Sequence, residues 1–274
     1  DQRAEDGEAR LDYGLELPEA RMRFQRTLRI REGESTLYFT ESTTNLTRID
    51  SPFCCQQHVT LGPPFVEGGV SRVDLPAKRG QTYPAVIHET DPMKPDQTYD
   101  WPNAPLQEGG TRDLRLYPED HCMAVVSVLL EPEEEFAYTA VSNPKLGLLV
   151  VYAFPREIFP WITLWYEHKA AEFLPYSNRA TTWGVEFGSV AQAVKFMENL
   201  TAGPLLGHPR CGMLPALHTI DINYQAHMLK IPSDWQGVAR IEHDKGDTIA
   251  WEIGSDRSAR TPSDWLVSTQ TSVK

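Results

Sequence analysis

Met22-Arg-Phe-Gln-Arg-Thr-Leu-Arg-Ile-Arg31 is the stretch that decides the fold class of this chain. Its even positions are apolar and its odd positions are polar, with Arg26 as the one exception. Because successive side chains of a β-strand point to opposite faces, a period of two indicates a strand with one buried and one wet face. The stretch therefore predicts a half-buried β-strand over Met22–Arg31.

Further segments rich in β-branched and aromatic residues follow along the chain, most of them bounded by Pro, Gly or Asp. They are Thr36–Thr40, Ala124–Leu130, Phe136–Ser142, Leu146–Phe154, Trp161–Tyr166, His218–Met228, Val238–His243 and Thr248–Ile253. Helical periodicity is scarce, and its best candidate is the short segment Ser189–Asn199, with Ser189 as a possible cap. Many closely spaced strands without strand–helix alternation favour an all-β sandwich or barrel over a parallel α/β sheet.

We expect a single domain over residues 1–274, because no repeat, low-complexity tract or obvious linker divides the chain. The Pro- and Gly-rich stretch Thr90–Gly110 is interpreted as a long ordered loop beside a site, rather than as a domain boundary.

Composition excludes several classes of function. With 26 Lys+Arg against 38 Asp+Glu, the formal charge of -12 disfavours nucleic acid as a partner, and no basic run is visible. The longest apolar stretch, Leu146–Phe154, is far shorter than the roughly 20 residues of a membrane-spanning helix, so no membrane association is expected. The four cysteines form neither a disulfide framework nor a zinc-site spacing, which predicts reduced thiols in a cytoplasmic protein.

Sequence motifs for phosphate-loop, dinucleotide, zinc-protease and serine-hydrolase chemistry are absent. General acid–base chemistry by His and carboxylate side chains therefore remains as the candidate chemistry. His58 lies in an apolar, Pro- and Gly-bounded segment, Pro52–Phe65, that could tune an imidazole to donate a proton near neutral pH. The alternative is a core histidine satisfied by a backbone carbonyl. Glu186 lies in Trp183-Gly-Val-Glu-Phe-Gly188, where a carboxylate among apolar neighbours either faces water or has a function.

Aromatic residues near Glu186 in the sequence favour a sugar ligand. Sugars present apolar C–H faces that stack on aromatic rings, while their hydroxyls need fixed polar partners. Trp161, Trp165 and Trp183 are the candidates, although packing in the core of a β-sandwich explains each of them equally well.

Four segments in this order make the chain resemble the galactose mutarotase (aldose 1-epimerase) family. They are Asn45–Phe53 leading into Gln57–Phe65, the pair Asp120-His121, the hairpin-like Ala140–Tyr152, and Arg179 with Trp183–Gly188. The resemblance covers roughly residues 20–255. The family's early segment, with its histidine and substrate-binding arginine, has no counterpart here, so the N-terminal part of the family fold is expected to be missing or divergent.

The resemblance implies a large antiparallel β-supersandwich that interconverts the α and β anomers of an aldose. It implies His58 as general acid and Glu186 as general base, with no cofactor, no metal and a small-molecule sugar as partner. The implied substrate-binding residues are Asp120, Gln57, Arg179, Trp165 and Trp183. The sugar is expected to be neutral, because no basic cluster lies near the predicted site.

Two other readings stay open at this point. One is a non-catalytic carbohydrate-binding or regulatory protein that keeps the sugar cleft. The other is a glycosidase or lyase relative, in which Glu167 or Glu172 would supply the second carboxylate that glycoside hydrolysis needs, although nothing marks either as more than a surface charge.

Overall fold

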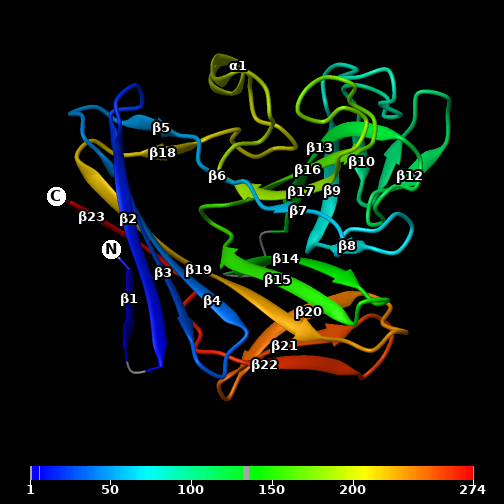
Figure 1. The fold of residues 1–274 in the computed structure, drawn as a ribbon. Helices are drawn as coiled ribbons and strands as arrows, with labels where there is room; N and C mark the ends of the chain where they lie inside the picture. Colours follow the sequence, from blue (N-terminus) through cyan, green and yellow to red (C-terminus); the bar gives the residue numbers. More distant parts are fainter. Residues whose placement is uncertain (1, 6, 132–135, 274) are drawn as a thin grey trace.

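The computed structural model of the protein describes residues 2–5, 7–131 and 136–273. These residues form antiparallel sheets and one short helix, which confirms the predicted all-β supersandwich. Figure 1 shows the sheets stacked as layers.

The larger sheet has nine strands and forms the central layer. In spatial order its path is β1 (Gln2–Glu5), β2 (Glu8–Leu17), β3 (Met22–Arg31), β4 (Thr36–Asn45), β19 (His218–Lys230), β15 (Leu148–Pro155), β14 (Phe136–Asn143) and β8 (Arg72–Asp74), with β23 (Ser268–Val273) paired to β19. Strand β3 has the bounds that the alternating pattern predicts.

The second sheet covers one face of the first and has seven strands. Its order is β10 (Thr98–Asp100), β9 (Ala77–Thr82), β13 (Cys122–Leu130), β16 (Trp161–His168), β17 (Thr181–Gly188) and β6 (Gln56–Gln57), with β7 (Thr60–Leu61) also paired to β17. The smaller elements are β5 (Ser51–Phe53) with β18 (Gly212–Leu214), β11 (Asn103–Pro105) with β12 (Thr111–Asp113), the sheet β20 (Val238–Asp244), β21 (Asp247–Glu252) and β22 (Ser258–Pro262), and helix α1 (Phe196–Thr201).

Two cores hold the layers together, and strand β15 contributes to both. On one face, Phe154 stacks on Phe187 of the second sheet with ring centroids 4.1 Å apart, inside the main apolar cluster between the two large sheets. On the other face, Leu149 and Val151 pack in a second cluster that includes Trp235. Because β15 is buried on both faces, its sequence is a continuous apolar run rather than an alternation of apolar and polar residues.

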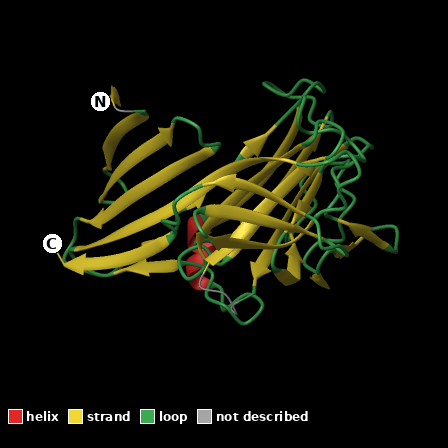
Figure 2. Cartoon of the chain, turned by 90° about the horizontal axis from the view of Figure 1, so that it is seen from below, coloured by secondary structure: helices red, strands yellow, loops and turns green. Residues whose placement is uncertain are grey.

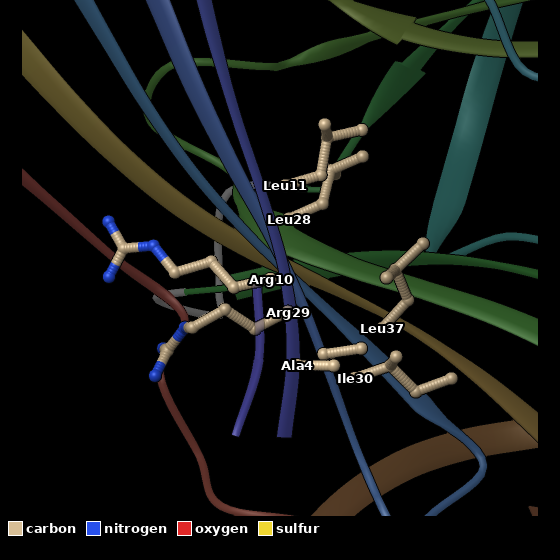
Figure 3. A pocket seen from close by; sticks show the side chains of 8 residues that line it. Ala4, Arg10, Leu11, Leu28, Arg29, Ile30 and Leu37 are labelled. Carbon is tan, nitrogen blue, oxygen red and sulfur yellow. The ribbon is translucent and has the colours of Figure 1, made fainter. Parts of the chain in front are cut away.

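Strands β1, β2 and β3 extend beyond the second sheet, so part of their apolar face stays uncovered (Figure 2). Tyr13, Leu15, Leu17 and Ile30 are between 40% and 48% exposed there. An open groove of about 480 Å³ follows this face. In Figure 3, Leu11 and Leu28 lie on one side of the strands while the guanidinium groups of Arg10 and Arg29 extend to the other, as the period of two requires.

The structure differs from the sequence analysis in three places. The predicted helix over Ser189–Asn199 is wrong in its start, because α1 begins at Phe196 and the Ser189 hydroxyl donates to the Phe53 carbonyl (2.5 Å) instead of capping a helix. Strand β2 was not expected, because the opening of the chain is dominated by charged residues. The stretch Thr90–Gly110 contains β10 and β11 and lies at the edge of the second sheet opposite β17, so it does not flank Glu186.

Candidate active site

Strand β17 places Glu186 on the outer face of the second sheet. Trp183, Val185 and Phe187 point into the main core and are fully buried, so Gly184 and Glu186 point the other way. On the neighbouring strand β16, Trp165 lies opposite Gly184 and therefore shares this outer face.

His58 reaches Glu186 because the edge of the sheet is interrupted. Strands β6 and β7 both pair with β17, and His58 lies in the gap between them. Its Nε2 atom is 3.2 Å from Oε1 of Glu186, and its Nδ1 atom is 2.9 Å from Oγ1 of Thr60. The His58 side chain is 62% exposed and that of Glu186 is 7% exposed, so the carboxylate is shielded while the imidazole faces solvent.

The second carboxylate oxygen of Glu186 also has a hydrogen-bond partner. The side-chain amide of Gln56 donates to Oε2 at 2.7 Å. Burial raises the pKa of Glu186 above its usual value, and the charge of His58 acts in the opposite direction. The result is a carboxylate with both oxygens in contact and a raised affinity for a proton, as suits a general base.

A glycine is required at position 184. A Cβ atom there would lie 2.6 Å from Oε1 of Glu186 and 3.0 Å from Cβ of Trp165, too close for an ordinary contact. The absence of a side chain thus leaves room for the Glu186 carboxylate at this point of the outer face.

An aromatic wall borders the pair. The rings of His58 and Trp165 lie 6.1 Å apart in an edge-to-face arrangement, and Tyr176 continues the row at 6.0 Å from Trp165. Tyr176 comes from the loop between β16 and β17, so this loop forms one side of the site.

The loop between β17 and β18 covers the other end of the outer face. Carbonyl oxygens of this loop accept hydrogen bonds from sheet residues: Pro209 from the Trp161 indole at 3.1 Å, and Leu206 from Arg79 at 2.9 Å. Trp161 is 1% exposed under this loop, which makes it a packing residue.

The structure brings together three of the predicted site residues: His58, Glu186 and Trp165. Gln57 does not join them, because it is buried between the two large sheets, where its amide donates to Glu41 (2.8 Å) and its oxygen accepts from Arg26 (2.8 Å). The substrate-binding role predicted for Gln57 is therefore not supported by its position beside His58 in the sequence.

Trp183 and Asp120 have other partners, and Arg179 forms no hydrogen bond or ion pair with His58 or Glu186 among the described residues. Trp183 is 0% exposed and packs on Tyr117 in the core, on the face opposite Glu186. Asp120 precedes β13 and forms an ion pair with Arg112 at 2.7 Å. Arg179 is exposed on the loop that carries Tyr176.

Sequence reasoning missed Gln56, the residue that holds Glu186 directly. It also missed that the spacing of Trp183 and Glu186 places their side chains on opposite faces of the sheet. The two are three positions apart in one strand, and an odd separation places side chains on opposite faces.

Several solved structures share this fold. A protein from Klebsiella pneumoniae subsp. pneumoniae MGH 78578, provisionally assigned as an aldose 1-epimerase, superposes with a TM-score of 0.58 at 14% identity, covering 82% of this chain and 51% of its own. One from Escherichia coli K12, assigned in the same way, gives 0.55 at 12% identity over 84% and 67%. A galactose mutarotase-like protein from Clostridium acetobutylicum gives 0.52 at 12% identity over 83% and 64%.

These likenesses confirm the galactose mutarotase-like fold that the sequence motifs indicate. The chain spans between 51% and 67% of the length of these three structures. No protein-family model and no curated protein sequence matches the chain. Among the described residues, no helix is long and apolar enough to cross a membrane.

Proposed function

We propose that this protein is an aldose 1-epimerase that interconverts the α and β anomers of a neutral sugar at His58 and Glu186. The contact of 3.2 Å between His58 Nε2 and Glu186 Oε1, on an outer face bordered by Trp165, is the observation that carries the proposal. The fold shared with proteins assigned to this activity supports it.

Ring opening needs one group that takes a proton from the anomeric hydroxyl and another that gives a proton to the ring oxygen. Both oxygens are bonded to the same carbon, so a base and an acid that are close neighbours can reach them together. The Glu186 carboxylate takes the hydroxyl proton, and the protonated His58 imidazole gives one to the ring oxygen. The ring opens to the aldehyde, the C1–C2 bond rotates, and the two groups exchange roles as the ring closes.

The surroundings of the pair fit this reaction. Gln56 holds Glu186 in place through Oε2 and leaves Oε1 in contact with His58. The exposed imidazole of His58 can exchange its proton with water between turnovers. Trp165 and Tyr176 offer aromatic surface for the apolar C–H face of a sugar ring.

Hydrolysis of a glycoside is disfavoured by the position of the other carboxylates. Glu167, expected to be a surface charge, is instead fully buried, and its Oε1 accepts from the backbone N–H groups of Ala170 and Ala171. Along β16 it lies four residues from Thr163, the partner of Glu186, an offset of about 13 Å at the usual rise per residue. Glu172 pairs with His88 at 3.0 Å on the surface. The offset of Glu167 exceeds the carboxylate spacing of glycosidases, and Glu172 is engaged by His88.

The test is a polarimetric comparison of anomer interconversion for freshly dissolved aldoses by the wild-type chain, Glu186→Gln and His58→Asn. We expect acceleration by wild type and a loss of at least about 100-fold in each variant, since each removes one partner of a proton transfer. Glu198→Gln on α1 and His243→Asn on β20 make the same chemical changes away from the site and should keep wild-type rates. Sugar binding without any acceleration by the folded wild type would instead favour the non-catalytic sugar-binding protein.

A further inference from the structure

Two thiols far apart in the sequence lie side by side near the end of a small two-stranded sheet. Cys54 directly follows β5 and Cys211 directly precedes β18, and these strands run next to each other in Figure 1. The Cys54 thiol donates to the Cys211 sulfur with the two Sγ atoms 3.0 Å apart, although 157 positions separate them in the chain. We propose that Cys54 and Cys211 form an oxidation site that closes to a disulfide when the protein meets a small-molecule disulfide.

The backbone around the pair already has the geometry of a disulfide. Strands β5 and β18 are antiparallel, with Phe53 opposite Gly212 and Pro52 opposite Met213. One further step in the same register sets Cys54 opposite Cys211. Residues directly opposite each other in an antiparallel pair have Cα atoms about 4.5–5.5 Å apart, within the range that disulfides span. Closure therefore needs the sulfur atoms to approach by about 1 Å, without a rearrangement of the backbone.

An oxidant can reach this pair. Cys54 is exposed and Cys211 is partly exposed. Cys54 also lines an open cavity of about 560 Å³ between the β2–β3 hairpin and the β5 segment, with Leu17, Met22 and Phe196 among its walls. This space is large enough for a small organic disulfide to approach the thiols.

Of the other two cysteines, Cys122 is buried, and Cys55 lines the same cavity but packs against the main apolar core. Cys122 is 1% exposed, and its sulfur contacts Arg112. The Cys55 sulfur lies 3.8 Å from the buried Gln57 amide, whereas the Cys54 sulfur lies 3.0 Å from that of Cys211. Oxidation should therefore be selective for Cys54 and Cys211 although Cys55 is adjacent in the sequence.

The reaction is two successive thiol–disulfide exchanges. One protein thiolate attacks a sulfur of the small disulfide R–S–S–R, forms a protein–S–S–R bond and releases R–S⁻. The second protein thiolate attacks the protein sulfur of this mixed disulfide, forms the Cys54–Cys211 bond and releases the second R–S⁻. The protein loses two electrons and two protons, and the small disulfide becomes two thiols R–SH.

The reaction should be slow at neutral pH and faster at alkaline pH. Burial raises the pKa of the Cys54 thiol to about 12, with the neighbouring Cys211 sulfur as a second cause. Because the thiolate is the reacting form, the supply of nucleophile rises with pH.

Closure would lock the segment that leads into the candidate site without moving it. Ser189 already anchors this segment, since its hydroxyl donates to the Phe53 carbonyl (2.5 Å) and accepts from the Cys55 N–H group (2.9 Å). Gln56 and His58 follow within four residues of Cys54. A covalent bond across a long stretch of chain restricts the unfolded state, so we expect the melting temperature to rise by roughly 5–10 °C.

The experiment incubates the full chain with oxidised glutathione at pH 8 and then counts free thiols after denaturation. We expect the count to fall from four to two, and peptide mapping to find Cys54 linked to Cys211. Cys54→Ser and Cys211→Ser should lose the link and the rise in melting temperature. Cys55→Ser is the matched control, one residue away, and should still close.

Four free thiols after prolonged exposure to oxidised glutathione would overturn the proposal. So would a link that maps to Cys55 in the wild-type chain, or a chain that keeps glutathione on Cys54 or Cys211 without closing the ring. Because the wild-type peptide map carries the decision, poor folding of a serine variant leaves the test intact.

Discussion

Replacement of Gly184 by Ala should separate His58 from Glu186 while leaving the fold in place. The added Cβ would lie 2.6 Å from Glu186 Oε1, whereas ordinary contacts begin near 3.4 Å, so the carboxylate oxygen has to move by about 0.8 Å. Oε1 is now 3.2 Å from His58 Nε2, at the long end of the hydrogen-bond range, so a shift of this size disrupts the present geometry of the contact.

The cost of this shift follows from the sensitivity of catalysis to placement. A misplacement of about 1 Å can reduce a rate by about 100-fold, which corresponds to about 2.7 kcal/mol in the activation free energy. We therefore expect Gly184→Ala to lower kcat for anomer interconversion by about 100-fold. Polarimetry measures the rate, and circular dichroism melting reports whether the sheet is intact.

Gly62→Ala is the matched control. Its Cβ would lie 3.6 Å from the Thr181 carbonyl oxygen, an ordinary contact, and it lies just beyond β7 near the same edge of the sheet. A folded Gly184→Ala variant with a rate within threefold of wild type would refute the reasoning, because it would show that the position of Oε1 does not matter.

His58→Asn removes the charge that lowers the pKa of Glu186, so this pKa should rise further. The acid limb of the pH–rate profile of any residual activity should therefore move to higher pH, and an unchanged limb would contradict its assignment to Glu186. Burial lowers the pKa of His227 to about 4, so in the folded chain it binds a proton less readily than in the unfolded chain, where the pKa is about 6.5. Its contribution to stability is complete above pH 6.5 and is lost as pH falls towards 4, by roughly 2 kcal/mol between pH 7 and pH 5. Urea unfolding should show this loss in wild type and a flatter profile in His227→Gln, and equal slopes would rule the explanation out. Trp165→Ala should raise the KM for the sugar with a small effect on folding, because Trp165 borders the candidate site. Trp183→Ala should lower the unfolding free energy by about 3–5 kcal/mol, because its ring fills the core. The opposite pattern would mean that Trp183 faces the site and Trp165 the core. The single-domain prediction implies one cooperative transition in calorimetry, and two separate transitions would contradict it.

The sequence predicts the strands well where apolar and polar residues alternate. Met22–Arg31 alternates except at Arg26, and β3 has these bounds. The predicted burial of its apolar face is only partial, because this face extends beyond the second sheet and Ile30 is 46% exposed. The same alternation runs through Leu11, Tyr13 and Leu15 of β2, so the signal for that strand was present among the charged residues. The helix prediction rested on Val190, Val194 and Met197 at helical spacing. It failed because this spacing does not outweigh the hydrogen bonds that hold Ser189 to the β5 segment.

The site is harder to predict because it depends on pairing between distant segments. Nothing in the spacing of the sequence shows that β6 and β7 pair with β17 and bring His58 to Glu186. The choice between Gln56 and Gln57 depends on register, since a shift of one residue exchanges the two faces of a strand. Family resemblance supplied His58 and Glu186, and the structure was needed to find Gln56.

The double burial of β15 has a consequence for how such chains diverge. A substitution at Leu149 has to suit one core and a substitution at Phe154 the other, so drift in this strand requires compensating changes in two separate sets of neighbours. On β17, by contrast, packing in the core constrains Val185, whereas the proposed chemistry on the outer face constrains Glu186 and Gly184. In a saturation mutagenesis library selected only for folding, we expect β15 to tolerate the fewest replacements and position 186, whose proposed role is catalytic, to vary more freely.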